Sequence, residues 1–91
     1  MAYLFDEPKD TVCIVCIHVV KENRPILYAS HDAEDGLWQF LCGKHDHHTD
    51  DSYKLISLEE ATIIDTSIND VYYLPLGSSI QRTTELDKWK T

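Results

Sequence analysis

Apolar residues are concentrated in three early segments of the chain, and each segment predicts a β-strand. Residues 11–20, TVCIVCIHVV, are apolar at nearly every position, which is typical of a strand covered on both faces. ILYASH and LWQFLC, at residues 26–31 and 37–42, follow short polar turns. The Asp35-Gly36 pair between them favours a tight hairpin. The first half of the chain therefore predicts an antiparallel meander of three strands.

The second half shows shorter patterns that mix strand and helix. YKLI at residues 53–56 predicts a fourth, short strand. Ser57 is followed three residues later by a glutamate, a capping box that predicts a short helix over roughly residues 58–64. Either Asp65 or Thr66 can cap a second short helical turn.

Taken together, these segments predict a single α+β domain over residues 1–91. Its antiparallel β-sheet has four or five strands, beginning with the N-terminal meander, and one or two short helices pack on it. The fifth strand is the weakly alternating SSIQRTT at residues 78–84, expected at a sheet edge. Residues 1–10 form an N-terminal arm and residues 85–91 a polar tail. A length of 91 residues suits one small domain.

Net charge narrows the range of partners. Eight Lys and Arg against sixteen Asp and Glu give a charge of -8. This charge repels phosphate backbones, so nucleic acid is not an expected partner. A basic protein, met through complementary charge, is the better expectation.

Membrane insertion and export are not expected either. No apolar run approaches the roughly 18 residues that a membrane helix needs. The first ten residues carry three acids and lack the basic region of a signal peptide. We therefore expect a cytoplasmic protein with no membrane partner.

Three cysteines without a secretion signal favour core thiols or metal ligands over a disulfide framework. The spacing Cys13-x-x-Cys16 with Cys42-x-x-His45 is similar to that of zinc fingers. However, residues three apart on a strand point to opposite faces, so Cys13 and Cys16 are not expected to reach one ion. The four-ligand pattern is therefore not the preferred site.

A better cluster follows from residues two apart on a strand, which share a face. This spacing brings Cys16 and His18 to within roughly 6–7 Å of each other. His31 and Cys42 lie near the ends of neighbouring predicted strands, and the next loop is rich in histidine. The candidate ligands of a metal site here, with zinc as the possible ion, are Cys16, His18, His31, Cys42, His47 and His48. The interpretation that we favour is simpler: the thiols are small buried apolar groups and His18 is a core histidine.

Catalytic chemistry has little support in the sequence. A nucleophilic cysteine needs a lowered pKa, usually from a neighbouring histidine or a helix N-terminus. The candidate pairs, Cys16 with His18 and Cys42 with His45, lack a third orienting group at a telling spacing. We therefore expect a protein that is not an enzyme.

Several short elements resemble a group of small uncharacterised bacterial proteins, which share CxHV, HD, WQFLCG, a following histidine and LPLG. Here these elements are Cys16 to Val19, His31-Asp32, Trp38 to Gly43, His47 or His48, and Leu74 to Gly77. That resemblance implies a shared fold, and its recurrent positions coincide with the cysteines and histidines chosen above. The DGLWQFLCG stretch is also similar to a domain family of unknown function linked to bacterial toxin-immunity proteins, which implies an immunity-like role.

Two functions follow from the sequence. Small size, negative charge and the absence of a recognisable catalytic pattern predict a non-enzymatic module that binds another protein, in an immunity-like role. The alternative is a metal-binding or thiol-dependent protein that uses the Cys/His cluster.

Overall fold

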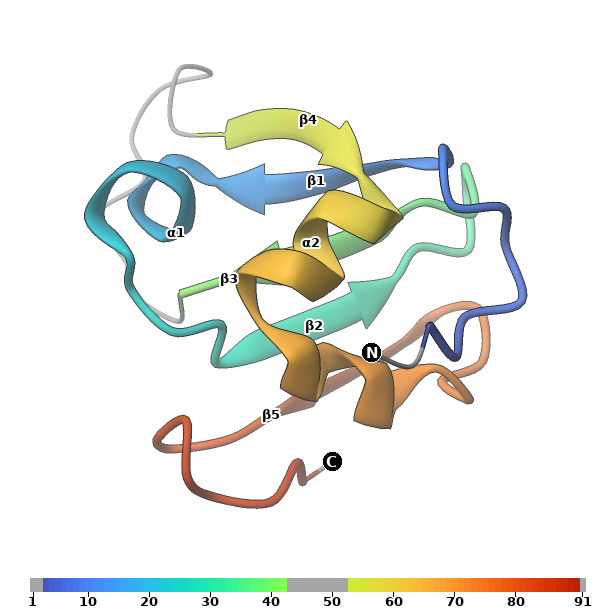
Figure 1. Cartoon of the computed structure of the whole chain (residues 1–91). Coiled ribbons are helices and arrows are strands. Elements are labelled where there is room, and N and C mark those ends of the chain that lie inside the picture. The colour runs from blue at the N-terminus through green and yellow to red at the C-terminus, as the bar shows by residue number, and fades with distance from the viewer. Residues whose placement is uncertain (1–2, 43–52, 91) are drawn as a thin grey trace.

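In the computed structural model, which describes residues 3–42 and 53–90, five β-strands form one sheet with helices packed on it (Figure 1). The elements in chain order are β1 (Val12–Cys16), α1 (Ile17–Glu22), β2 (Tyr28–His31), β3 (Trp38–Leu41), β4 (Tyr53–Ser57), α2 (Leu58–Ile64), the 3₁₀ helix η2 (Thr66–Val71) and β5 (Ser78–Gln81). The strand order across the sheet is β4-β1-β3-β2-β5. The predicted α+β class is confirmed.

The sheet is mixed, so the predicted antiparallel meander is wrong at its first connection. β1 runs parallel to β3, with Val15 opposite Phe40, and antiparallel to β4. The hairpin between β2 and β3 is present, with His31 opposite Trp38. β3 therefore lies between β1 and β2, and the chain must cross over after β1, as a parallel pair requires.

The crossover begins where the first apolar run changes conformation. Residues 11–20 were expected to be one strand, but the extended chain ends at Cys16 and α1 begins at the next residue. Asn23 ends α1 in the left-handed conformation that is common at helix C-termini, and its amide donates to the carbonyl of His18. Dense β-branched residues predict a strand locally, but a helix here buries Val19 and turns the chain toward β2.

Local signals in the second half predicted their elements well. Ser57 accepts a hydrogen bond from the amide of Glu60 at 3.1 Å, as a helix N-cap does, and α2 has the predicted bounds. Asp65 caps η2 by accepting a hydrogen bond from the amide of Ser67 at 3.0 Å. The predicted strands at residues 53–56 and 78–84 are present as β4 and β5, both at sheet edges.

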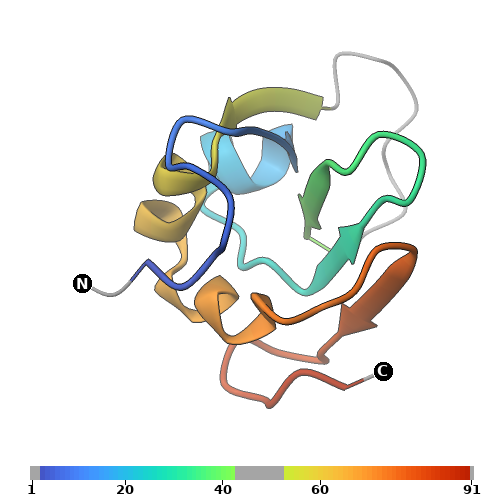
Figure 2. The same ribbon diagram turned by 90° about the vertical axis from the view of Figure 1, so that its right-hand side faces the viewer.

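The hydrophobic core lies between one face of the sheet and the helices α2 and η2 (Figure 2). Its largest fully buried side chains include Trp38, Phe40, Ile26, Leu58 and Ile68. The N-terminal segment closes one side of this core, since the Phe5 ring packs edge-on against Trp38 with centroids 5.0 Å apart. The Trp38 indole also donates a hydrogen bond to Glu7 at 2.7 Å.

Arg82 connects the C-terminal segment to the core. Its Nε donates to the carbonyl oxygen of Ile26 at 3.0 Å, and its Nη2 lies 2.9 Å from the Asp65 carboxylate. The guanidinium also stacks over the Trp89 ring, 4.2 Å from its centroid. One buried cation, directly after β5, therefore joins the segment before β2, the N-cap of η2 and the tail.

None of the helices in the two described ranges has the length and apolar content needed to span a bilayer.

Candidate metal centre

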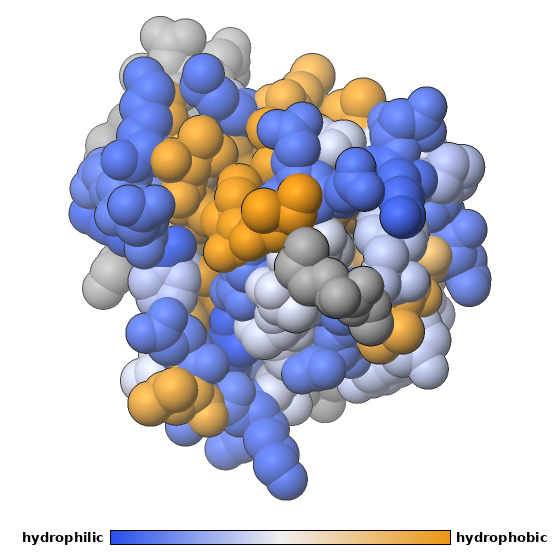
Figure 3. Space-filling view, viewed as in Figure 1, coloured by the Kyte–Doolittle hydropathy of each residue, from blue (hydrophilic) through white to orange (hydrophobic). Residues whose placement is uncertain are grey.

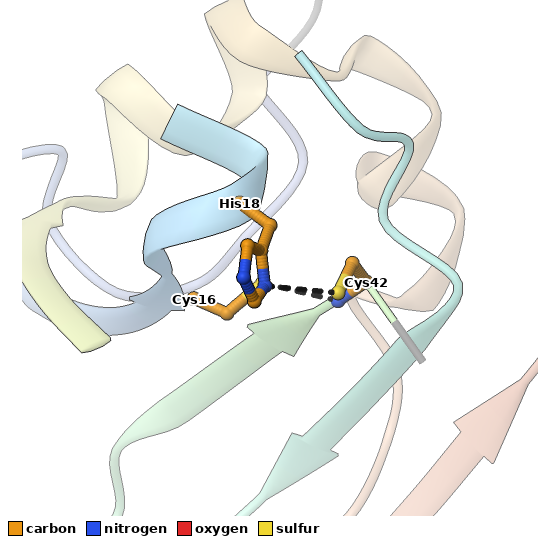
Figure 4. Close-up of side chains that lie close together, drawn as sticks. All are labelled: Cys16, His18 and Cys42. Atoms are coloured by element: carbon orange, nitrogen blue, oxygen red, sulfur yellow. Dashed lines mark hydrogen bonds between the residues drawn. The ribbon is translucent and has the colours of Figure 1, made fainter. Parts of the chain in front are cut away.

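Three potential metal ligands meet where β1 and β3 end (Figure 4). Cys16 is the last residue of β1, His18 lies in the first turn of α1, and Cys42 directly follows β3. Because β1 and β3 are parallel neighbours, both strands finish at the same end of the sheet. One sulfur or ring nitrogen from each residue lies within 4.8 Å of the other two. Among the described residues, these three form a compact Cys₂His group.

Direct contacts hold the three side chains together. The Cys42 amide donates a hydrogen bond to the Cys16 sulfur at 3.3 Å. The Cys42 sulfur lies 3.7 Å from Nδ1 of His18. Both thiols are buried, at 0% and 2% exposure, and the histidine ring is largely covered. The group is thus part of the packed interior.

The spacing of these atoms suits a tetrahedral ion. With zinc–sulfur bonds of about 2.3 Å and zinc–nitrogen bonds of about 2.0–2.1 Å, tetrahedral angles separate sulfur from nitrogen by roughly 3.6 Å. The Cys42 sulfur and the His18 nitrogen are 3.7 Å apart. The Cys16 sulfur lies within 4.8 Å of both, whereas two sulfurs bound to one zinc ion are roughly 3.8 Å apart. An ion therefore needs only a small contraction of the group.

The second nitrogen of the His18 ring faces a carboxylate. Nε2 lies 3.8 Å from Glu22, which is one turn further along α1. Glu22 is in turn 3.4 Å from the guanidinium of Arg24. A carboxylate on the far nitrogen of a ligating histidine is a common arrangement in metal sites, because it fixes which nitrogen carries the proton. At 3.8 Å the His18–Glu22 contact is an ion-pair distance and not a hydrogen bond, and the other ring nitrogen, Nδ1, faces the Cys42 sulfur.

Burial governs the protonation of the Cys16 thiol. Desolvation raises the pKa of Cys16 above its usual value. Hydrogen bonds from the amides of Val19 and Cys42 lower this pKa in part, and the neighbouring Cys42 thiol raises it further. In the metal-free protein Cys16 is therefore a neutral thiol at neutral pH. A nucleophilic cysteine needs the opposite shift, so this environment does not favour thiol catalysis. A bound cation displaces the thiol proton instead.

Cys13 lies elsewhere in the core and offers a matched control. It is as fully buried as Cys16 but is not part of the Cys₂His group. Burial is the main cause that raises the pKa of Cys13 to about 12, and the nearby Glu60 carboxylate adds to it. Among the described residues Cys13 and Cys16 do not belong to one ligand group, and the expectation that they do not share an ion stays a prediction.

The buried thiol of Cys13 predicts that the metal-free protein loses stability as the pH rises above about 9. The thiol of the unfolded chain titrates near 9.0 and that of the folded chain near 12. The raised pKa therefore contributes its full share to the free energy of unfolding below pH 9. This contribution, at most about 4 kcal/mol, is lost as the pH rises from 9 toward 12. Urea unfolding of the wild type and Cys13→Ala across this range measures the difference. Equal pH dependence in the two proteins would contradict the prediction.

The other predicted ligands are not brought to this group. Nδ1 of His31 lies 2.9 Å from the carbonyl oxygen of Leu74, and its Nε2 lies 3.5 Å from Glu7. The ring stacks on Trp38 with centroids 4.1 Å apart. His31 therefore belongs to the contacts between the sheet, the N-terminal segment and the loop before β5. His47 and His48, together with His45, lie outside the described residues.

Glu22 was missed by the sequence analysis. Its signal was the spacing His18-x-x-x-Glu22, which places two side chains on one helix face. The spacing has no such meaning on a strand, so the strand prediction for residues 11–20 concealed it.

No family model matches the chain, and no curated protein or solved structure matches it.

Proposed function

We propose that the protein binds one zinc ion through Cys16, His18 and Cys42. The observation that carries this proposal is the meeting of two sulfurs and one imidazole nitrogen within 4.8 Å. Thiolate and imidazole are preferred ligands of zinc, whereas magnesium and calcium prefer oxygen. Figure 4 shows the three side chains converging from two segments of the chain.

The competing interpretation is an ordinary core contact between two thiols and a histidine. Two features favour the metal. His18 Nδ1 faces a sulfur at a distance expected for two ligands of one zinc ion. Glu22 faces Nε2 and supplies the outer carboxylate typical of metal-binding histidines. Both features are expected of a ligand set. A thiol–imidazole hydrogen bond and an i,i+4 pair on one helix would give the same distances, so the metal content of the protein decides between the two interpretations.

A bound ion would mainly stabilise the fold. It would tie the junction of β1 and α1 to the residue after β3, two segments that lie far apart in the sequence and come together only on folding. An ion that binds the folded state alone raises stability with its concentration. Three protein ligands leave a fourth position for water or another donor.

Elemental analysis of protein purified without a histidine tag tests this proposal. We expect one equivalent of zinc in the wild type and in Cys13→Ser, and substantially less in Cys16→Ser. Equal zinc in Cys16→Ser and Cys13→Ser would contradict the proposal, because the ion would then not depend on the proposed ligand.

Replacing Glu22 by glutamine should weaken zinc binding by about 10–100-fold without removing a ligand. In the proposed site the negative charge of Glu22 orients the His18 ring and makes the ring a stronger base. Glutamine removes that charge. Competition with a chromogenic chelator gives the affinity. Glu34→Gln, in the exposed turn before β3, removes the same charge elsewhere and should bind zinc as the wild type does. Equal affinities of the two variants would show that the carboxylate has no such role.

The immunity-like role that the resemblance implies stays a prediction.

A further inference from the structure

The strand β4 presents an edge of the sheet that is open within the described residues. There it pairs with β1 alone and ends the strand order (Figure 1). The other edge is different, because Lys90 of the tail forms a backbone bridge to Gln81 of β5. An unpaired edge offers rows of amides and carbonyls to another extended chain.

A groove beside this edge adds apolar surface to it. Ile14 on β1 lies opposite Leu55 on β4 and Gln39 on β3. These residues, with Tyr53 and Lys54, line a groove of about 380 Å³. Leu55 is 68% exposed, an unusual position for a leucine in a strand. The groove lies on the sheet face away from α2, since the alternate residues of β1, such as Val15, are buried in the core.

Acidic side chains gather near the end of β4 that leads into α2. Glu59 and Glu60 lie in the first turn of α2 and are exposed. Asp10 is also exposed and lies near this turn on the side of β1, because backbone hydrogen bonds from Leu58 and Glu59 to residues 11 and 9 continue the pairing of β4 with β1. Lys9 pairs with Glu59 at 3.7 Å and offsets only part of this charge. The groove thus has an apolar middle and the exposed Lys54 on β4, with acidic side chains beyond the end of the strand, at the start of α2 and beside β1.

We propose that β4 accepts an extended basic and apolar segment of a partner protein as a sixth strand of the sheet. Backbone hydrogen bonds to β4 would supply affinity, as in other cases of strand addition. An apolar side chain of the partner enters the groove at Ile14 and Leu55, and a Lys or Arg further along reaches Glu60 or Asp10. A second copy of this chain is a poorer occupant, because each copy carries a charge of -8. This inference is independent of the metal centre.

The test uses a fluorescent peptide of about six residues in which lysine and valine alternate. Fluorescence anisotropy should show binding to the wild type, weaker binding of a glutamate–valine peptide, and loss of binding when alternate amides of the lysine peptide are methylated. Methylation keeps the charge and side chains but removes the backbone donors that pair with an edge strand.

Two variants with the same change of charge distinguish binding of the peptide at the β4 groove from nonspecific electrostatic attraction to the protein. Leu55→Lys removes the apolar contact and should weaken binding of the lysine–valine peptide by about tenfold or more. Ile63→Lys is the matched control. Ile63 is 59% exposed and lies on α2, which covers the sheet face away from the groove. Figure 3 shows apolar surface of this layer among polar residues. The control variant should lose much less affinity.

Several outcomes would overturn the proposal. No binding of the lysine–valine peptide, equal losses in the two variants, or full binding of the methylated peptide would each do so. Sedimentation that shows a wild-type dimer abolished by Leu55→Lys would assign the edge to a second copy and would also overturn it. Because zinc binding does not involve Leu55, none of these outcomes bears on the metal centre.

Discussion

Replacing Arg82 by alanine should destabilise the fold by about 3–5 kcal/mol, a large share of the total stability of a small domain. Arg82 is only 7% exposed. Its loss leaves the Asp65 carboxylate without its partner at 2.9 Å and removes a donor from the carbonyl of Ile26. A partly buried charge without its partner costs more than the ion pair itself contributes. Urea unfolding measures the change.

A surface ion pair provides the control for Arg82. Lys9 lies 3.7 Å from Glu59, and both side chains are more than half exposed. Lys9→Ala should therefore cost at most about 1 kcal/mol. If Arg82→Ala does not fold, Arg82→Lys keeps the charge but loses the planar fork and should give an intermediate loss. Similar losses in the Arg82 and Lys9 variants would contradict the structural role assigned to Arg82.

Zinc should raise the melting temperature of the wild-type protein substantially. At a free zinc concentration one hundred times the dissociation constant, an ion bound only to the folded state adds about 2.7 kcal/mol. In a domain of this size the gain corresponds to a rise of roughly 10–20 °C. Calorimetry of chelator-treated protein, with and without added zinc, measures the shift.

Cysteine variants show which residues the zinc-induced rise in melting temperature depends on, and therefore where the ion binds. Cys42→Ser should lose most of this thermal shift, whereas Cys13→Ser should retain it, because Cys13 is buried outside the Cys₂His group. Cys42→Ser keeps the histidines at positions 45, 47 and 48, so any shift that persists in it reports other sites. A full shift in Cys42→Ser would contradict the proposed ligand set.

The elements that the sequence predicted correctly have local causes. The capping residue Ser57, the cap at Asp65 and the turn at Gly36 each act within a few residues of themselves. The parallel pairing of β1 with β3 is different, because it joins residues about 25 positions apart and depends on the packing of the whole sheet. Composition favoured a strand through residues 17–20 as well, but these residues form the first part of α1, which buries Val19 and ends at Asn23.

The sequence predicted part of the candidate site, but partly from a wrong secondary structure. Strand spacing placed Cys16 and His18 on one face, but a turn from strand to helix brings them together. Cys42 joins them because β1 and β3 are parallel neighbours, whereas the predicted meander placed the strand at residues 26–31 between them. His31 was already separable from Cys42 by the predicted hairpin, since His31 precedes the turn and lies opposite Trp38, at the other end of β3.

The most direct test of the metal centre is a cobalt(II) titration of the metal-free protein, followed through the charge-transfer absorption of cysteine thiolates bound to cobalt. Histidines elsewhere do not produce this band, so it reports the thiols alone. We expect it to saturate at one equivalent in the wild type and in Cys13→Ser, and to be lost or greatly reduced in Cys16→Ser and Cys42→Ser. No band in the wild type, or an unchanged band in Cys16→Ser, would contradict the proposal that Cys16, His18 and Cys42 bind one ion.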